Sequence, residues 1–115
     1  MASHEEALKK FVDDLYADNF TEHEVMSFAP NWDSDLHAPG HDGRQLVLEG
    51  SVVLEVAGKT RVFAAGETYE VPANTMHREV FGEGGARLCI GRRKPGAPPL
   101  RKSGHVDWTG GGKPC

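Results

Sequence analysis

Seven short apolar or alternating segments between residues 24 and 92 constrain the fold more than any other feature of the chain. Their sequences are EVMSF, QLVLEG, SVVLEV, TRVFAA, TYEVP, HREVF and ARLCIG. They are separated by segments rich in Gly, Pro and Asn, namely APN, APG, AGK, AGE, PAN and GEGG. Short strands at regular spacing, with Gly and Pro in the turns, are typical of an antiparallel β-sandwich or β-barrel.

An amphipathic helix is predicted ahead of this region, over residues 3–17. Ser3 and Glu6 have the spacing of a capping box at its start. The apolar positions recur on one face of the helix, at Leu8, Phe11, Val12, Leu15 and Tyr16. Because a single amphipathic helix is marginally stable alone, we expect this face to cover the β region.

The length of 115 residues allows one domain. We divide it into an N-terminal helix over 1–20, a β-barrel over 21–93 and a basic tail rich in Pro and Gly over 94–115. The net charge of −4 combines −9 in residues 1–91 with +5 in the remainder. The basic end lacks a nucleic-acid-binding motif, so we expect no nucleic acid partner and a tail that is solvated or folds back onto the acidic body.

The chain contains no apolar run long enough to cross a bilayer and no basic-then-apolar leader. These observations predict a cytoplasmic protein without a membrane partner. Cys89 and Cys115 form no paired motif, so we expect both thiols to be reduced.

Two histidines flank a Pro-Gly pair in the segment HAPGH, at His37 and His41. Four extended residues span roughly 13 Å, whereas two imidazoles that share an ion each lie about 2.0–2.1 Å from it. Pro39 and Gly40 occupy the central positions of a predicted type II turn, which would give Gly40 a positive φ and bring the Cα atoms of Ala38 and His41 within about 7 Å. Such a turn would place His37 and His41 side by side. The alternative is an ordinary loop with one histidine in solvent.

A further histidine, His77, follows the segment VPANTM. It is either a metal ligand or a buried histidine that donates to a backbone carbonyl. Glu79 lies two residues on and therefore on the same face of a strand. Its carboxylate could be a ligand, a group that orients an imidazole, a general base or a solvated group. The remaining histidines have no partner pattern and are expected at the surface, namely His4, His23 and His105.

The residues from Gly66 to Phe81 resemble the second signature of the cupin superfamily of small jelly-roll barrels, G-x5-P-x-G-x2-H-x3-N. Gly66, Pro72 and His77 match the signature, and Phe81 replaces its last asparagine. Asn74 stands at the usual glycine, and asparagine tolerates a left-handed backbone better than most residues. The resemblance covers residues 24–92 and is to small single-domain bacterial cupins of the conserved-barrel type.

The first cupin signature, G-x5-H-x-H-x3-4-E-x6-G, aligns in two ways. In one, His37 is the first histidine, while Pro39 and Gly43 replace the second histidine and the glutamate. In the other, His41 is the second histidine and Gln45 replaces the glutamate. The resemblance thus implies a metal site formed by His37, His41, Gln45 and His77.

This ligand set suits a divalent transition metal such as Fe, Mn, Ni or Zn. The resemblance implies a metal-dependent oxygenase, isomerase or lyase that acts on a small polar molecule, with Glu79 as the candidate catalytic residue. The alternative is a non-catalytic barrel that binds a small ligand or a metal. Small cupins commonly pair through the edges of their sheets, so a homodimer is also expected.

Overall fold

The computed structural model describes residues 4–94 and contains one helix and five strands. In chain order these are α1 (His4–Ala17), β1 (Glu22–Phe28), β2 (Asp42–Val56), β3 (Lys59–Ala64), β4 (Thr68–Val71) and β5 (Arg78–Arg93). The cap residue Ser3 and all of the predicted tail except Lys94 lie outside the described residues. No helix within residues 4–94 has the length and apolar character that a membrane span requires.

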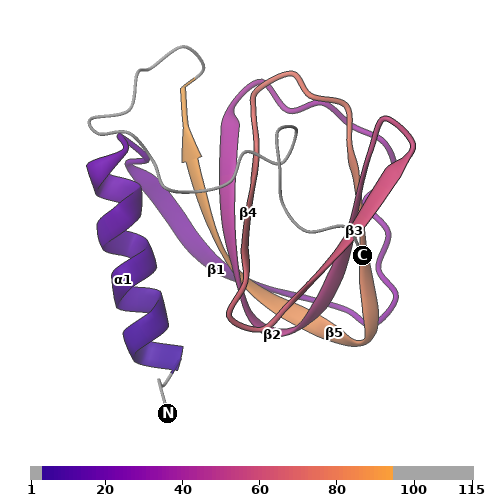
Figure 1. Ribbon diagram of the computed structural model, residues 1–115, viewed down its shortest axis with the longest axis horizontal. Helices are drawn as coiled ribbons and strands as arrows, with labels where there is room; N and C mark the ends of the chain where they lie inside the picture. Colours follow the sequence, from indigo (N-terminus) through magenta and orange to yellow (C-terminus); the bar gives the residue numbers. More distant parts are fainter. Residues whose placement is uncertain (1–3, 95–115) are drawn as a thin grey trace.

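The strands form one antiparallel sheet in the order β1-β5-β2-β3, with β4 also paired to β2. The long strand β2 pairs with β5 along one edge. Along its other edge it pairs with β4 over residues 43–46 and with β3 over residues 51–56. The sheet curls into a barrel, and α1 lies beside it (Figure 1). The prediction of an all-β barrel with one N-terminal helix is confirmed.

One predicted turn and one further strand boundary are wrong, because β2 and β5 each run through a point where the sequence suggested that a strand ends. The segment GEGG lies inside β5, where the register with β2 shifts between Gly50 and Val52. Gly50 and Gly85 have φ of 79° and 74°, and a Cβ on Gly50 would lie 2.1 Å from the Gly85 carbonyl oxygen. The glycines therefore bend two long strands where they cross closely, instead of ending them.

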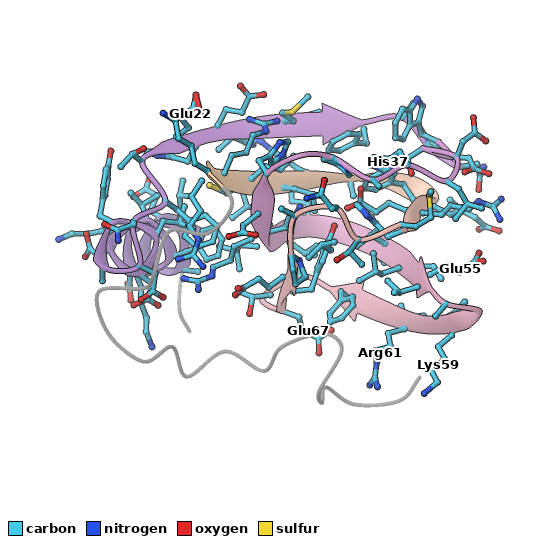
Figure 2. The ribbon with its side chains drawn as sticks, turned by 90° about the horizontal axis from the view of Figure 1, so that it is seen from above. Glu22, His37, Glu55, Lys59, Arg61 and Glu67 are labelled. Atoms are coloured by element: carbon cyan, nitrogen blue, oxygen red, sulfur yellow. The ribbon has the colours of Figure 1, made fainter. Side chains whose placement is uncertain are left out.

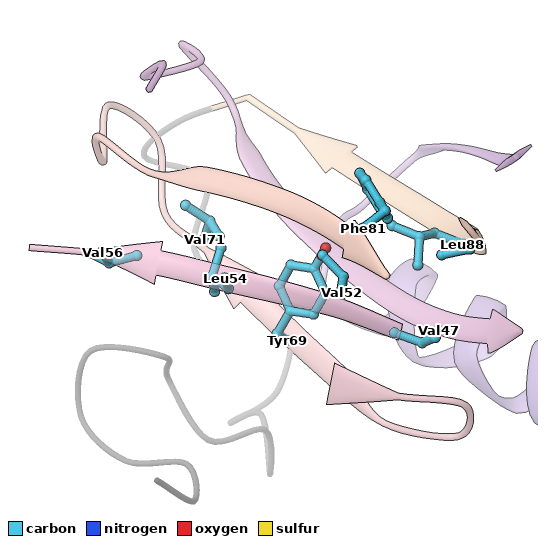
Figure 3. Close-up of a cluster of buried hydrophobic side chains, with 9 residues drawn as sticks. Val47, Val52, Leu54, Val56, Tyr69, Val71, Phe81 and Leu88 are labelled. Atoms are coloured by element: carbon cyan, nitrogen blue, oxygen red, sulfur yellow. The ribbon is translucent and has the colours of Figure 1, made fainter. Parts of the chain in front are cut away.

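Alternate residues of the strands fill the barrel. The inner cluster consists of Val47, Val52, Leu54, Val56, Tyr69, Val71, Phe81, Ala86 and Leu88. Figure 3 shows these side chains between the facing strands. The ring of Phe81 stacks on Phe28 with centroids 4.3 Å apart. This apolar cluster fills one part of the barrel interior, and polar side chains line a cavity in another part.

The helix covers the outer face of the barrel, as its apolar periodicity predicted. Phe11 and Leu15 are buried against Leu46, Leu48 and Cys89. Tyr16, by contrast, is 52% exposed, so the buried face of the helix is narrower than the apolar pattern. Close packing is possible because β5 has a glycine at position 91, where a Cβ would lie 2.5 Å from the Leu15 side chain.

A buried charged cluster joins the end of α1 to the barrel. Arg44 is 1% exposed, and its guanidinium lies 2.7 Å from Asp18 and 3.0 Å from Glu70. The ring of Phe20 lies between the guanidinium groups of Arg44 and Arg93, at 4.5 Å and 4.7 Å. A buried arginine is tolerated when it is paired and stacked in this way.

Candidate metal and ligand site

His37 and His77 lie directly opposite one another in an isolated antiparallel bridge. Each amide donates to the carbonyl of the other residue at 2.9 Å. Their ring centroids are 4.3 Å apart. His37 lies on the segment between β1 and β2, on the opposite side of the molecule from Lys59 of β3 (Figure 2). Backbone pairing thus brings together two imidazoles from distant parts of the sequence.

Both imidazoles are oriented by backbone carbonyls. Nδ1 of His37 lies 3.0 Å from the carbonyl oxygen of Asp35, and Nδ1 of His77 lies 2.9 Å from that of Thr75. Because a carbonyl only accepts, each Nδ1 carries the hydrogen and donates it. In the neutral ring this leaves the lone pair on Nε2, which is the usual arrangement of a metal-ligating histidine.

Glu79 completes a group of three ligand atoms. One donor atom from each of His37, His77 and Glu79 lies within 4.8 Å of the other two. Oε1 of Glu79 is 3.8 Å from Nε2 of His77. Two imidazoles and one carboxylate form the donor set of many divalent metal sites with open coordination positions. The side chains therefore fit a divalent transition metal.

Tyr69 fixes the other oxygen of this carboxylate. Its hydroxyl donates to Oε2 of Glu79 at 2.5 Å. Burial, reinforced by the charge of Glu79, raises the pKa of Tyr69 well above its ordinary value, so the phenol remains a donor. Oε1 is consequently the oxygen that faces His77.

The segment that carries His37 is anchored to β5. The Asp33 carboxylate binds the Arg78 guanidinium through two hydrogen bonds, one of them 2.9 Å from Nε. This partner lowers the pKa of Asp33 to about 2. Next to it, the amide of Glu79 donates to the Ser34 hydroxyl at 2.9 Å. These contacts hold the two histidine-bearing segments in register.

His41 and Gln45 line the same cavity, which has a volume of about 200 Å³. His41 contributes no atom to the group formed by His37, His77 and Glu79. The Gln45 side chain is buried, with 7% of its surface exposed. The structure thus brings all five predicted site residues to one cavity, and ligand atoms of His37, His77 and Glu79 lie within 4.8 Å of one another.

The predicted type II turn at Pro39 and Gly40 is wrong. Among the glycines of residues 4–94, positive φ occurs at positions 50, 58, 66 and 85 but not at Gly40. The carbonyl of Pro39 instead accepts a hydrogen bond of 2.8 Å from the amide of Asn74. The loop therefore runs alongside the residues that precede His77 and does not close on itself, so His41 is not brought to His37.

The left-handed backbone expected at Asn74 is confirmed, with φ of 63°. Sequence reasoning missed two polar residues of the site, Tyr69 and Arg92. Tyr69 was detectable only as an inward position of the alternating segment TYEV. Arg92 also lines the cavity, and its signal was its even spacing from Leu88 and Ile90 on β5.

Several solved structures with this architecture are named cupins. An RmlC-like cupin from Shewanella frigidimarina matches with a TM-score of 0.54 and 26% identity, over 61% of this chain and 63% of its own. A cupin-2 domain protein from the same organism matches with a TM-score of 0.54 and 16% identity, over 63% and 68%. A protein of unknown function from Rhizobium leguminosarum matches with a TM-score of 0.59 and 22% identity, over 64% and 68%.

No protein-family model and no curated protein matches the sequence. The alignment to the RmlC-like cupin spans less than two thirds of that protein. The barrel, with polar side chains gathered in its cavity, has the jelly-roll fold of a cupin. Proteins named cupins are among the solved structures that share this fold, which agrees with the resemblance of the second signature.

Proposed function

We propose that this cupin barrel binds a divalent transition metal through His37, His77 and Glu79 and acts as a metal-dependent enzyme on a small polar molecule. The convergence of two imidazoles and a carboxylate on one point carries the proposal. Both Nδ1 atoms are engaged by carbonyls, which leaves Nε2 of each ring to coordinate. Fe, Mn, Ni and Zn all accept such a donor set.

The bound metal would supply a Lewis acid with open coordination positions for water or substrate. Three protein ligands leave such positions in catalytic sites. In this arrangement Tyr69 orients the Glu79 carboxylate, and the backbone carbonyls orient the imidazoles. His41 and Gln45 line the cavity beside this group and are available to contact a substrate.

A non-catalytic barrel that binds a metal or a small ligand is the second candidate. It is favoured by Pro39 and Gly43, which stand where the first cupin signature has its second histidine and its glutamate. Turnover separates the two functions. The metal-loaded protein is incubated with mixtures of small polar molecules, and loss of any component is followed by NMR. Catalysis requires a loss that stops in the His77→Ala variant.

Metal binding is tested by elemental analysis of protein purified without a histidine tag. We expect close to one metal ion per chain in the parent. His77→Ala and Glu79→Gln should lose most of it, because the first removes a ligand and the second replaces a charged carboxylate with a neutral, weaker amide. His23→Ala is the matched control, since that imidazole is exposed and packs edge-on against Tyr16. Metal well below one per chain in the parent would contradict the proposal.

We also propose that the protein forms a homodimer through a sheet edge. The strand order leaves β1 and β3 at the two ends of the sheet, and exposed strand edges are usually covered. Val25 on β1 is 40% exposed and Val62 on β3 is 51% exposed. Light scattering at micromolar concentration should give the mass of a dimer. A monomer mass would exclude this assembly.

A further inference from the structure

Gln45 offers an unpaired amide oxygen to the cavity. Its side chain is 7% exposed, and Oε1 is buried without a hydrogen bond among the described residues. Leaving a buried acceptor unpaired is unfavourable, and most such groups in folded proteins have a partner. A bound molecule that donates a hydrogen bond to this oxygen, for example from a hydroxyl group, would satisfy it.

Arg92 brings a positive charge to the same cavity. It lies on the inward face of β5, two residues after Ile90, and pairs in register with Gly43 of β2. Its guanidinium is only loosely held, at 3.7 Å from the half-exposed carboxylate of Glu24 and 4.0 Å from the Met26 sulfur. Exposed ion pairs of this length contribute little. Arg92 can therefore turn its planar donors towards an anion.

The neighbouring Arg93 makes the contrast clear. Its Nε donates to Asp42 at 2.8 Å, and another guanidinium nitrogen donates to the Asp18 carbonyl at 2.7 Å. Its guanidinium also lies against the ring of Phe20, in the segment that follows the helix. Arg93 is thus engaged in structure, whereas Arg92 faces the cavity with weak contacts.

The cavity admits only a small ligand. Its volume of about 200 Å³ corresponds to about seven water molecules. Val71, Pro72 and Ile90 give it an apolar wall. A guanidinium, an unpaired acceptor oxygen and an apolar wall in this space favour a short hydroxy acid. Arginine binds carboxylates with two parallel hydrogen bonds, and the hydroxyl can donate to the Gln45 oxygen.

We infer that the cavity binds a small hydroxy acid. Arg92 binds its carboxylate, its hydroxyl donates to Oε1 of Gln45, and the rest of the molecule is directed towards His37, His77 and Glu79. The last contact rests on the proposed metal function, whereas the contacts with Arg92 and Gln45 do not. The ligand class therefore narrows the proposed substrate from a small polar molecule to a small organic acid.

The experiment compares lactate with lactamide, which has nearly the same shape and no charge. Binding to ¹⁵N-labelled protein is followed by NMR titration, with the protein either stripped by EDTA or loaded with Zn²⁺. Lactate should bind in both states, and lactamide at least about tenfold more weakly. Arg92→Gln should raise the lactate Kd at least about tenfold, and the near-isosteric Gln45→Met about three- to tenfold.

Arg87→Gln is the matched control. Arg87 is on the same strand, is 53% exposed and pairs with Glu49 outside this cavity. It should leave the lactate Kd unchanged. The inference is overturned if lactamide binds as tightly as lactate, if Arg92→Gln binds lactate like the parent, or if the parent shows no saturable shift up to about 100 mM lactate.

The His77→Ala variant separates the two proposals. Loss of zinc together with retained, Arg92-dependent lactate binding supports the carboxylate site independently of catalysis. If the parent itself binds no zinc but still binds lactate through Arg92, the metal function fails and the carboxylate site stands. Zinc binding without any selective lactate binding gives the reverse result.

Discussion

Removal of one hydroxyl group, in Tyr69→Phe, tests whether the proposed metal site depends on an oriented carboxylate. The Tyr69 side chain is 3% exposed, and its ring packs against Phe63 with centroids 4.8 Å apart. Phenylalanine retains this ring and its packing. The variant therefore removes only the hydrogen bond of 2.5 Å to Oε2 of Glu79.

The expected magnitude follows from that bond. A hydrogen bond to a charged group contributes about 1.5–3 kcal/mol. If the bond holds Glu79 in its ligating position, its loss should weaken metal binding by about 10–100-fold, the range for partners that orient metal ligands. The metal-free protein should remain folded, because the volume and shape of the core are nearly unchanged.

Competition between the protein and a chromophoric zinc chelator at neutral pH measures this change. Tyr16→Phe is the control, since Tyr16 is 52% exposed on the helix. Equal zinc affinities for the parent and Tyr69→Phe would refute the orienting role of the phenol. Equal losses in both variants would also refute it, since the effect would then not arise at the site.

Three further predictions concern stability. Gly50→Ala should destabilise the barrel by more than about 2 kcal/mol in urea unfolding, because it adds a backbone clash to left-handed strain. Gly40→Ala is the control and should be nearly neutral, since its Cβ would meet no atom within 4 Å. Leu15→Ala should cost about 2–5 kcal/mol by the same measurement, because this fully buried side chain joins the helix to the barrel. The pKa of Asp33 in the folded protein is about 2, below its ordinary value of 3.8, so its ionised carboxylate stabilises the fold at pH values above 3.8. This stability should be lost as the pH falls towards 2. Acid unfolding of Asp33→Asn should lack this component, and parallel acid curves for the parent and the variant would contradict the assignment.

Local signals in the sequence were sufficient for the helix, for most of the strand segments and for the barrel fold. Alternating polarity and helical periodicity depend on neighbouring residues, so they survive in any tertiary context. The backbone conformation of Asn74 is also local, because its cost is set by its own side chain. His77 was identifiable for the same reason, since its spacing from Gly66 and Pro72 belongs to one continuous signature.

Glycine and proline were less informative about the positions of turns, because the same residue can occur in a turn, in a bend within a strand or in an extended loop. Gly85 bends a continuous strand, yet GEGG has the composition of a turn. Pro39 and Gly40 have the sequence of a type II turn, yet a hydrogen bond from Asn74 takes up the Pro39 carbonyl. In each case a partner from another part of the chain decided the conformation.

The site was decided by tertiary structure. His37 meets His77 through strand register, and a shift of one residue would turn the imidazole to the other face. Tyr69 reaches Glu79, and Arg92 enters the same cavity as Gln45, only because the sheet closes into a barrel. Residue types and local spacing determined which polar side chains were available for a site. Long-range strand pairing determined which of them meet, because local sequence patterns do not record contacts between distant strands.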